Sequence, residues 1–152
     1  MTDLERLIAI EDIRRLQARY ARLADAKDWR ALAALFLPDG SFVSHDLAGQ
    51  PQGSMRGRAD LVRQIGAAVG AGTAIHHLLS YEIEVHSPTR AHAIWAMEDW
   101  VDRSAEAATA EAPLPFRTMH GCGHYHTDYE KVDGAWFIAS QKLYRVKLEF
   151  TY

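Results

Sequence analysis

The two halves of this 152-residue chain carry different hydrophobic patterns, and this division constrains the fold more than any other feature of the sequence. Between residues 3 and 26, apolar side chains recur at spacings of three and four, which predicts one long amphipathic helix. After residue 72 the chain changes to long runs of branched and aromatic residues, which predict β-strands. Helices followed by antiparallel strands are typical of an α+β domain whose helices pack on one face of a sheet.

Shorter elements complete this pattern. The segment 29–37 reads as a second helix that ends at the turn signature 38–40, and a short strand is expected at 41–44 directly after the turn. A third helix is expected over 59–69, after a loop over 47–57. Two pairs of antiparallel strands follow the helices, and a loop over 104–116 separates the pairs; the four predicted strands span 75–85, 90–102, 117–132 and 134–150. We expect a single domain, 1–152: a cone-shaped, curved antiparallel or mixed sheet that wraps around the long helix and two further helices and encloses an apolar cavity.

Composition excludes several classes of function. The net charge is −3 and no lysine-arginine block occurs, so nucleic acid is not an expected partner. Cys122 is the only cysteine, which excludes an intrachain disulfide and a zinc cluster built from several thiolates. Charges interrupt the apolar positions of the N-terminal segment, unlike a signal peptide or a membrane span. We therefore expect a cytoplasmic protein without a membrane partner.

Three polar residues occupy positions in the predicted elements that need an explanation. Tyr20 lies on the apolar stripe of the first helix, either as a core tyrosine or with its hydroxyl directed into a cavity. Asp25 lies at the unfavourable end of the helix dipole, where it either needs a partner or is solvated or caps the helix. Asp99 shares a strand face with Trp95 and Met97, so it is either paired with a buried group, such as a histidine, or part of a surface ion pair.

The adjacent histidines at 76 and 77 must point to opposite faces of their strand. Strict alternation places His77 with Leu79 and Tyr81 on the apolar face and turns His76 outward. Further along, His120, His124 and His126 share one face, as a possible metal site or, by preference, as solvated or interface histidines, and we predict no metal. Gly121 and Gly123 indicate a bulge or a close approach to the backbone, and Cys122 reads as a small buried residue rather than a nucleophile.

The stretch IEDIRRLQARYARLADAKDWRALAALFLPDGSF resembles the opening of SnoaL-like proteins of the nuclear transport factor 2-like superfamily. IWAMEDW, GHYHTDYEKVDGAWFI and LYRVK continue the likeness to the C-terminus, and the chain looks most like the bile-acid 7α-dehydratase branch. Matching positions imply five catalytic residues, which are Tyr20, Asp25, His76, Asp99 and Arg145. Leu79 and Tyr81 depart from that branch, which can have histidine and often has proline there.

The resemblance implies a cofactor-independent lyase that eliminates water from a hydroxylated, carbonyl-activated hydrophobic molecule, such as a steroid, polyketide or terpenoid. His76, oriented by Asp99, would act as the general base or acid. Tyr20, positioned by Asp25, would hydrogen-bond to the carbonyl or the departing hydroxyl. Arg145 would hold an anionic or carbonyl group. Two alternatives are a double-bond isomerase and a non-catalytic binding or dimerisation module, and a homodimer or higher oligomer is expected. Predicted pocket walls are His77, Leu79, Trp95, Met97 and Tyr125.

The resemblance selects His76 as the catalytic histidine, whereas strand alternation selects His77. Both can hold if the strand has a register break between Leu78 and Glu82, because one extra residue reverses every later side chain. We therefore predict a bulge just after the two histidines, with Asp99 within hydrogen-bonding distance of one ring and not of the other.

Overall fold

A computed structural model describes residues 1–106 and 113–152. Over these residues the chain forms three helices and six strands. In chain order they are α1 (Asp3–Asp25), α2 (Trp29–Ala34), β1 (Phe36–His45), β2 (Pro51–Arg56), α3 (Arg58–Val69), β3 (Thr73–Ser87), β4 (Arg90–Asp102), β5 (Thr118–Val132) and β6 (Ala135–Thr151).

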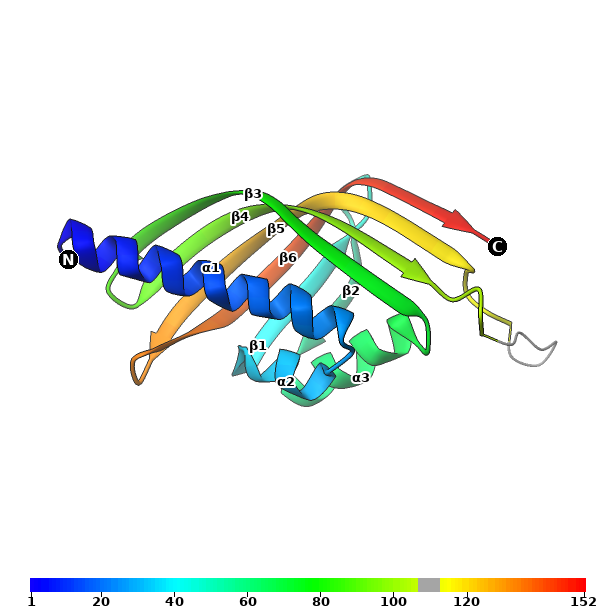
Figure 1. Cartoon of the computed structure of the whole chain (residues 1–152), viewed down its shortest axis with the longest axis horizontal. Helices are drawn as coiled ribbons and strands as arrows, with labels where there is room; N and C mark the ends of the chain where they lie inside the picture. Colours follow the sequence, from blue (N-terminus) through cyan, green and yellow to red (C-terminus); the bar gives the residue numbers. More distant parts are fainter. Residues whose placement is uncertain (107–112) are drawn as a thin grey trace.

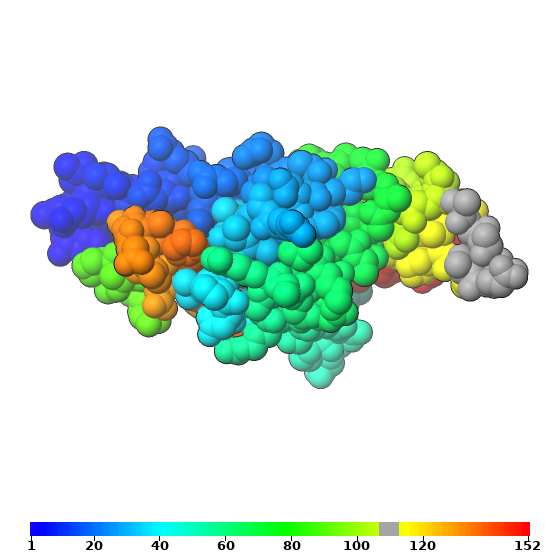
Figure 2. Space-filling model, turned by 90° about the horizontal axis from the view of Figure 1, so that it is seen from below, coloured from blue at the N-terminus to red at the C-terminus, as the bar shows by residue number. Residues whose placement is uncertain are grey.

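The strands form one curved, unclosed sheet in the order β2-β1-β6-β5-β4-β3. β1 and β6 run parallel and every other neighbouring pair is antiparallel, so the sheet is mixed. The three helices lie on the same side of the sheet (Figure 1). From the helix side, the strand segment that follows residue 112 projects beyond the helices (Figure 2). The predicted α+β class, with a long N-terminal helix against a curved sheet, is confirmed.

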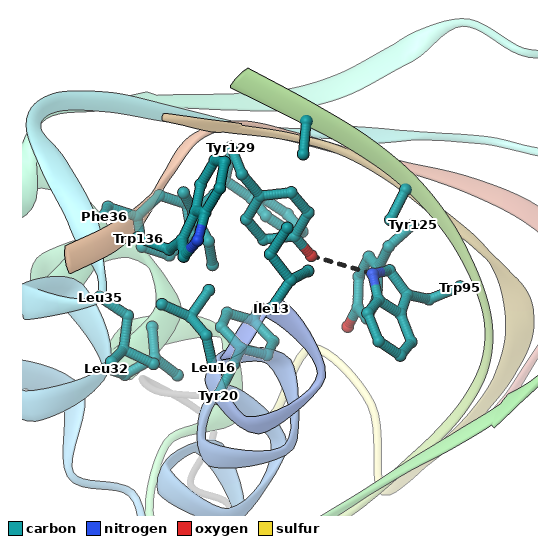
Figure 3. Packing of buried hydrophobic residues seen from close by; sticks show 14 of the residues in the cluster. Ile13, Leu16, Tyr20, Leu32, Leu35, Phe36, Trp95, Tyr125, Tyr129 and Trp136 are labelled. Atoms are coloured by element: carbon teal, nitrogen blue, oxygen red, sulfur yellow. Dashed lines mark hydrogen bonds between the residues drawn. The ribbon is translucent and has the colours of Figure 1, made fainter. Parts of the chain in front are cut away.

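Helix α1 is held in place by its cap and by its apolar stripe. Thr2 and Glu5 form a reciprocal capping box at the N-terminus, which satisfies backbone donors that a helix start leaves free. Ile13, Leu16 and Tyr20 are buried against the sheet, in agreement with the spacing seen in the sequence (Figure 3). Burial of this stripe fixes which side chains of the helix reach the inner face of the sheet.

A chain of buried polar groups crosses this core. Trp95 Nε1 donates to the Tyr129 hydroxyl at 2.9 Å (Figure 3), and that hydroxyl donates to Gln17 Oε1 at 2.7 Å. Gln17 Nε2 in turn donates to Gln141 Oε1 at 2.9 Å. These bonds tie α1 to β4, β5 and β6 with specific partners, which apolar packing alone does not provide.

Three predicted boundaries are wrong. The second helix was expected to continue to residue 37, but α2 ends at Ala34 and β1 begins at Phe36. The turn signature 38–40 lies inside β1, where the pairing with β6 shifts register, so it interrupts the strand rather than preceding it. The predicted loop 47–57 contains β2, a mostly exposed strand with few apolar side chains to mark it. A turn at 46–49 joins β1 to β2, because Asp46 Oδ1 accepts hydrogen bonds from the backbone nitrogens of Ala48 and Gln50.

The predicted loop 104–116 is described only at its ends, because its residues 107–112 lie outside the described residues. Among the helices that are described, none is long and apolar enough to span a bilayer.

Candidate active site

A pocket of about 530 Å³ opens between the inner face of the sheet and the helices. This volume lies within the usual range for small-molecule sites. Most of its lining side chains are apolar and come from α3 and the strands, while a few titratable groups reach the same space. The lining titratable groups are Tyr20, Asp46, His76, Asp99, Tyr125 and Arg145.

A register break in β3 decides which histidine enters the pocket. His76 pairs with Asp99, His77 with Glu98 and Leu78 with Met97, but the next paired residue, Tyr81, lies opposite Trp95. Two residues of β3 therefore oppose one residue of β4, which is a β-bulge. The predicted bulge is confirmed: His76 shares the inner face with buried Asp99, and His77 points outward.

Helix α1 supplies the partner of His76. Asp25, the last residue of α1, accepts a hydrogen bond from the backbone nitrogen of His76 at 2.8 Å. The same oxygen lies 2.9 Å from His76 Nδ1. The side chain of His76 is 13% exposed, so the ring is enclosed yet still lines the pocket. Because Nδ1 is engaged by a carboxylate, Nε2 is the nitrogen left to meet a substrate.

Asp99 has a different partner from the one expected. Its carboxylate forms a bidentate pair with Arg145, at 2.5 Å from Nη1 and 2.9 Å from Nη2, and both side chains are 8% exposed. Burial acts to lower the pKa of Arg145, but the hydrogen bonds and charge of Asp99 outweigh it and raise that pKa. The expected orientation of His76 by Asp99 is thus replaced by Asp25, and Arg145 is neutralised by Asp99 rather than left to bind an anion.

Two tyrosines stand beside this ion pair. The rings of Tyr20 and Tyr125 meet edge to face, with centroids 5.9 Å apart. Burial raises the pKa of Tyr20 above its ordinary value, although hydrogen bonding with Tyr125 and Gln141 offsets part of this effect. Burial also raises the pKa of Tyr125, and the charge of Tyr20 acts in the same direction. Both phenols are therefore held as hydrogen-bond donors rather than bases.

Gly121 makes room for the ion pair. A Cβ at this position would overlap the Arg145 guanidinium and lie 2.6 Å from Asp99 Oδ1. The predicted close approach to the backbone is therefore confirmed at Gly121, where the Arg145 and Asp99 side chains are the approaching groups. At Gly123 the pairing of β5 with β6 shifts register, as predicted for a bulge.

The predicted pocket walls are placed in three different environments. Tyr125 lines the pocket. His77 and Leu79 lie on the other side of β3, where the side chain of His77 is 55% exposed and Leu79 is 62% exposed. His77 precedes the bulge and Leu79 is its first residue, so the reversal of side-chain direction comes after both. Trp95 and Met97 face inward but are buried in the core cluster, outside the pocket lining.

Several lining residues were not anticipated from the sequence. Phe116, Met119, Leu148 and Phe150 line the pocket from the segment before β5, the start of β5 and the end of β6. These ends of the strands continue beyond the helices (Figure 1). Asp46 lines it from the β1–β2 turn. Its pKa is lowered, chiefly by the hydrogen bond from the Gln50 backbone. The Asp-x-x-Gly spacing at 46–49 was the available signal for that turn.

The chain is similar to known proteins over most of its length. Residues 5–142 match the family model of the SnoaL-like domain. A probable cyclase, FGR4, of Gibberella zeae is 28% identical over 88% of this chain and 89% of its own.

Solved structures show the same fold at low identity. A putative scytalone dehydratase from Novosphingobium aromaticivorans superimposes with a TM-score of 0.80 at 19% identity, covering 99% of this chain and 93% of that one. A hexachlorocyclohexane dehydrochlorinase, LinA-type3, from Novosphingobium barchaimii gives 0.75 at 16% identity, covering 98% and 94%.

Proposed function

Because the chain belongs to the SnoaL-like family, we propose that it is a cofactor-independent lyase that eliminates water from a neutral, hydrophobic β-hydroxy carbonyl compound. The observation that carries this proposal is the Asp25–His76 pair, whose ring lines a mainly apolar pocket together with two protonated phenols. The names of its relatives, a cyclase, a dehydratase and a dehydrochlorinase, agree with acid-base chemistry of this type.

The proposed reaction uses one base and two hydrogen-bond donors. His76 Nε2 removes the proton from the carbon next to the carbonyl group, while Tyr20 and Tyr125 donate to the carbonyl oxygen, on which negative charge develops. The carbon–carbon double bond then forms as the carbon–oxygen bond breaks. The hydroxyl group takes the proton from the His76 imidazolium and leaves as water, which restores the neutral ring. Asp25, through its contact with Nδ1, holds the ring in the same orientation during both proton transfers.

The charges around the pocket favour a neutral substrate. Arg145 is paired with Asp99, so its charge is already balanced. Asp46 adds a carboxylate to the lining whose lowered pKa keeps it ionised at neutral pH. An anionic substrate would therefore meet no free cation among these groups and would be repelled by Asp46. The expected role of Arg145 as an anion holder is accordingly not part of the proposal.

The test is incubation of the protein in D₂O with a panel of neutral fused-ring β-hydroxy ketones, followed by mass analysis. We expect loss of one water. His76→Gln should slow this loss by about 10²–10⁴-fold, the usual contribution of a positioned acid or base. Tyr20→Phe should slow it by about 10²–10³-fold, the usual cost of removing one hydrogen-bond donor from a developing oxyanion. His92→Ala is the matched control, because His92 also pairs with an aspartate, Asp128, but lies outside the pocket lining. Its rate should equal that of the unaltered protein.

Two results would contradict dehydration. Deuterium incorporation next to the carbonyl without loss of water would show that the site removes the proton but does not expel the hydroxyl. Migration of the double bond in a β,γ-unsaturated ketone would then assign the same residues to double-bond isomerisation. Saturable binding with neither exchange nor loss of water would identify a binding module.

A further inference from the structure

The outer face of the sheet carries a second cluster of titratable side chains, directly behind the pocket. His77 pairs across the strands with Glu98, and Glu98 with Cys122, so the three form a row over β3, β4 and β5. His120 lies two residues before Cys122 on the same face of β5. None of these four groups takes part in the proposed elimination.

Three members of this outer-face cluster of His77, Glu98, His120 and Cys122 bring their donor atoms together, namely Glu98, His120 and Cys122. Glu98 Oε1 lies 2.7 Å from His120 Nε2, and Cys122 Sγ lies 3.9 Å from the same nitrogen. One ligand atom from each of these three residues lies within 4.8 Å of the others. The second carboxylate oxygen of Glu98 is 3.4 Å from His77 Nδ1, so His77 lies beside this group on the β3 side. Its side chain is 55% exposed, and its ring has to turn toward the other three donors to become a fourth ligand.

Neighbouring side chains fix the orientation of the central histidine. The Trp100 ring stacks on His120 with centroids 3.6 Å apart and an interplanar angle of 11°. Glu149 lies 3.9 Å from His120 Nδ1, the nitrogen that faces away from the cluster. A carboxylate beside the second ring nitrogen is a common arrangement behind metal-bound histidines.

We propose that the outer-face cluster binds Zn²⁺ or a divalent cation of similar softness, with Glu98, His120 and Cys122 as ligands and His77 as the fourth. A thiolate, two imidazoles and a carboxylate are the donors that Zn²⁺ prefers, and two of them are anionic, so the bound cation is neutralised. Cys122 releases its proton to solvent on binding.

The distances suit tetrahedral coordination after a small adjustment. Bonds of about 2.0 Å to nitrogen or oxygen and about 2.3 Å to sulfur place neighbouring ligand atoms roughly 3.3–3.6 Å apart. The observed 2.7 Å and 3.9 Å lie on either side of that range. Glu98 and His120 must therefore separate by about half an ångström. Both side chains are partly exposed, at 29% and 19%, and have room to move.

Binding would link three strands that also carry the pocket. His77, Glu98 and Cys122 each adjoin a residue of the inner face, respectively His76, Asp99 and Gly121. A cation held between them would oppose separation of β3, β4 and β5. Because the unfolded chain lacks this arrangement, we expect the metal to raise the melting temperature.

The experiment is titration of the reduced full-length protein with Co²⁺, followed by displacement with Zn²⁺. We expect one Co²⁺ per chain, with visible bands of tetrahedral cobalt and a thiolate-to-cobalt charge-transfer band in the near ultraviolet. Cys122→Ser should abolish the charge-transfer band. His120→Ala and Glu98→Gln should each weaken binding by at least about tenfold, the smallest loss usual when even a supporting residue of a metal site is removed.

His92→Ala is the control, since it removes a histidine with a carboxylate partner from another part of the sheet. It should leave the Co²⁺ affinity and the charge-transfer band unchanged. Circular dichroism of each metal-free variant shows that the fold is retained. The proposal is overturned if Co²⁺ gives no thiolate band, or if the affinity survives Cys122→Ser and His120→Ala, which would indicate adventitious binding at surface histidines.

Discussion

Replacement of Asp99 by asparagine tests the ion pair at the centre of the candidate site. Asparagine has nearly the same shape, so the change removes charge without opening a cavity. The Arg145 guanidinium, 8% exposed, then stays buried without its counter-ion. Removing one partner of a buried pair costs about 3–5 kcal/mol. For a chain of this length, about 1 kcal/mol corresponds to roughly 2–4 °C in the melting temperature, so we expect a decrease of about 6–20 °C.

Urea unfolding followed by tryptophan fluorescence measures this loss, with calorimetry as a second observable. The matched control is Asp39→Asn, because Asp39 pairs with Arg56 on the surface, where the two side chains are 76% and 75% exposed. An exposed pair contributes about 0–1 kcal/mol. The double variant Asp99→Leu/Arg145→Met removes both charges and should recover most of the lost stability.

A cost below about 1 kcal/mol for Asp99→Asn would refute this reasoning, because it would show that water screens the pair as it screens a surface pair. A double variant as unstable as Asp99→Asn alone would also refute it, by showing that packing rather than an unpaired charge is responsible.

Three further predictions concern other parts of the fold. Gly121→Ala should lower both the melting temperature and the proposed turnover, since the new methyl group overlaps the Arg145 guanidinium; unchanged values of both would contradict the packing described. Tyr129→Phe should destabilise the protein by about 1–3 kcal/mol in urea unfolding, because it leaves two buried partners unsatisfied, and a neutral result would show that water replaces the hydroxyl. The pKa of His126 is lowered, chiefly by burial. The charges of His92, His124 and Lys142 lower it further, whereas the charge of Asp128 raises it. As the pH falls, the unfolded chain therefore protonates at His126 before the folded chain does, so stability decreases as the pH falls through about 6.5. His126→Gln should make the free energy of unfolding less sensitive to pH in this range. An equally steep pH dependence in the variant would exclude His126 as its cause.

Local sequence patterns predicted the elements whose periodicity is strong and missed those without it. The long helix and the four long strands follow from spacing, because one face of each is buried. Strand β2 lacks that signal, since it lies at the edge of the sheet and buries little apolar surface. The turn signature 38–40 was misleading because Gly40 and its neighbours form an irregular stretch of β1 rather than its boundary.

The site was predictable in its residues but not in its pairings. The bulge after His77 could be inferred because the pattern and the family resemblance disagreed, and a bulge is the simplest geometry that reconciles them. The partner of His76 could not, because Asp25 lies 51 positions away in the sequence. That contact depends on where α1 ends relative to β3, and local propensity does not contain this information.

The exchange of carboxylate partners changes the chemistry that the site can perform. If Asp99 oriented His76, Arg145 would carry an unbalanced charge in the pocket and would favour an anion. With Asp99 bound to Arg145, the pocket holds a neutral pair, and the acid-base function falls to His76 alone. The side chain of Asp25 is 39% exposed, so solvent screens its charge and its main contribution is to fix the ring orientation. Asp25→Asn should therefore reduce turnover less than His76→Gln does, and an equal loss would mean that the carboxylate charge itself is essential.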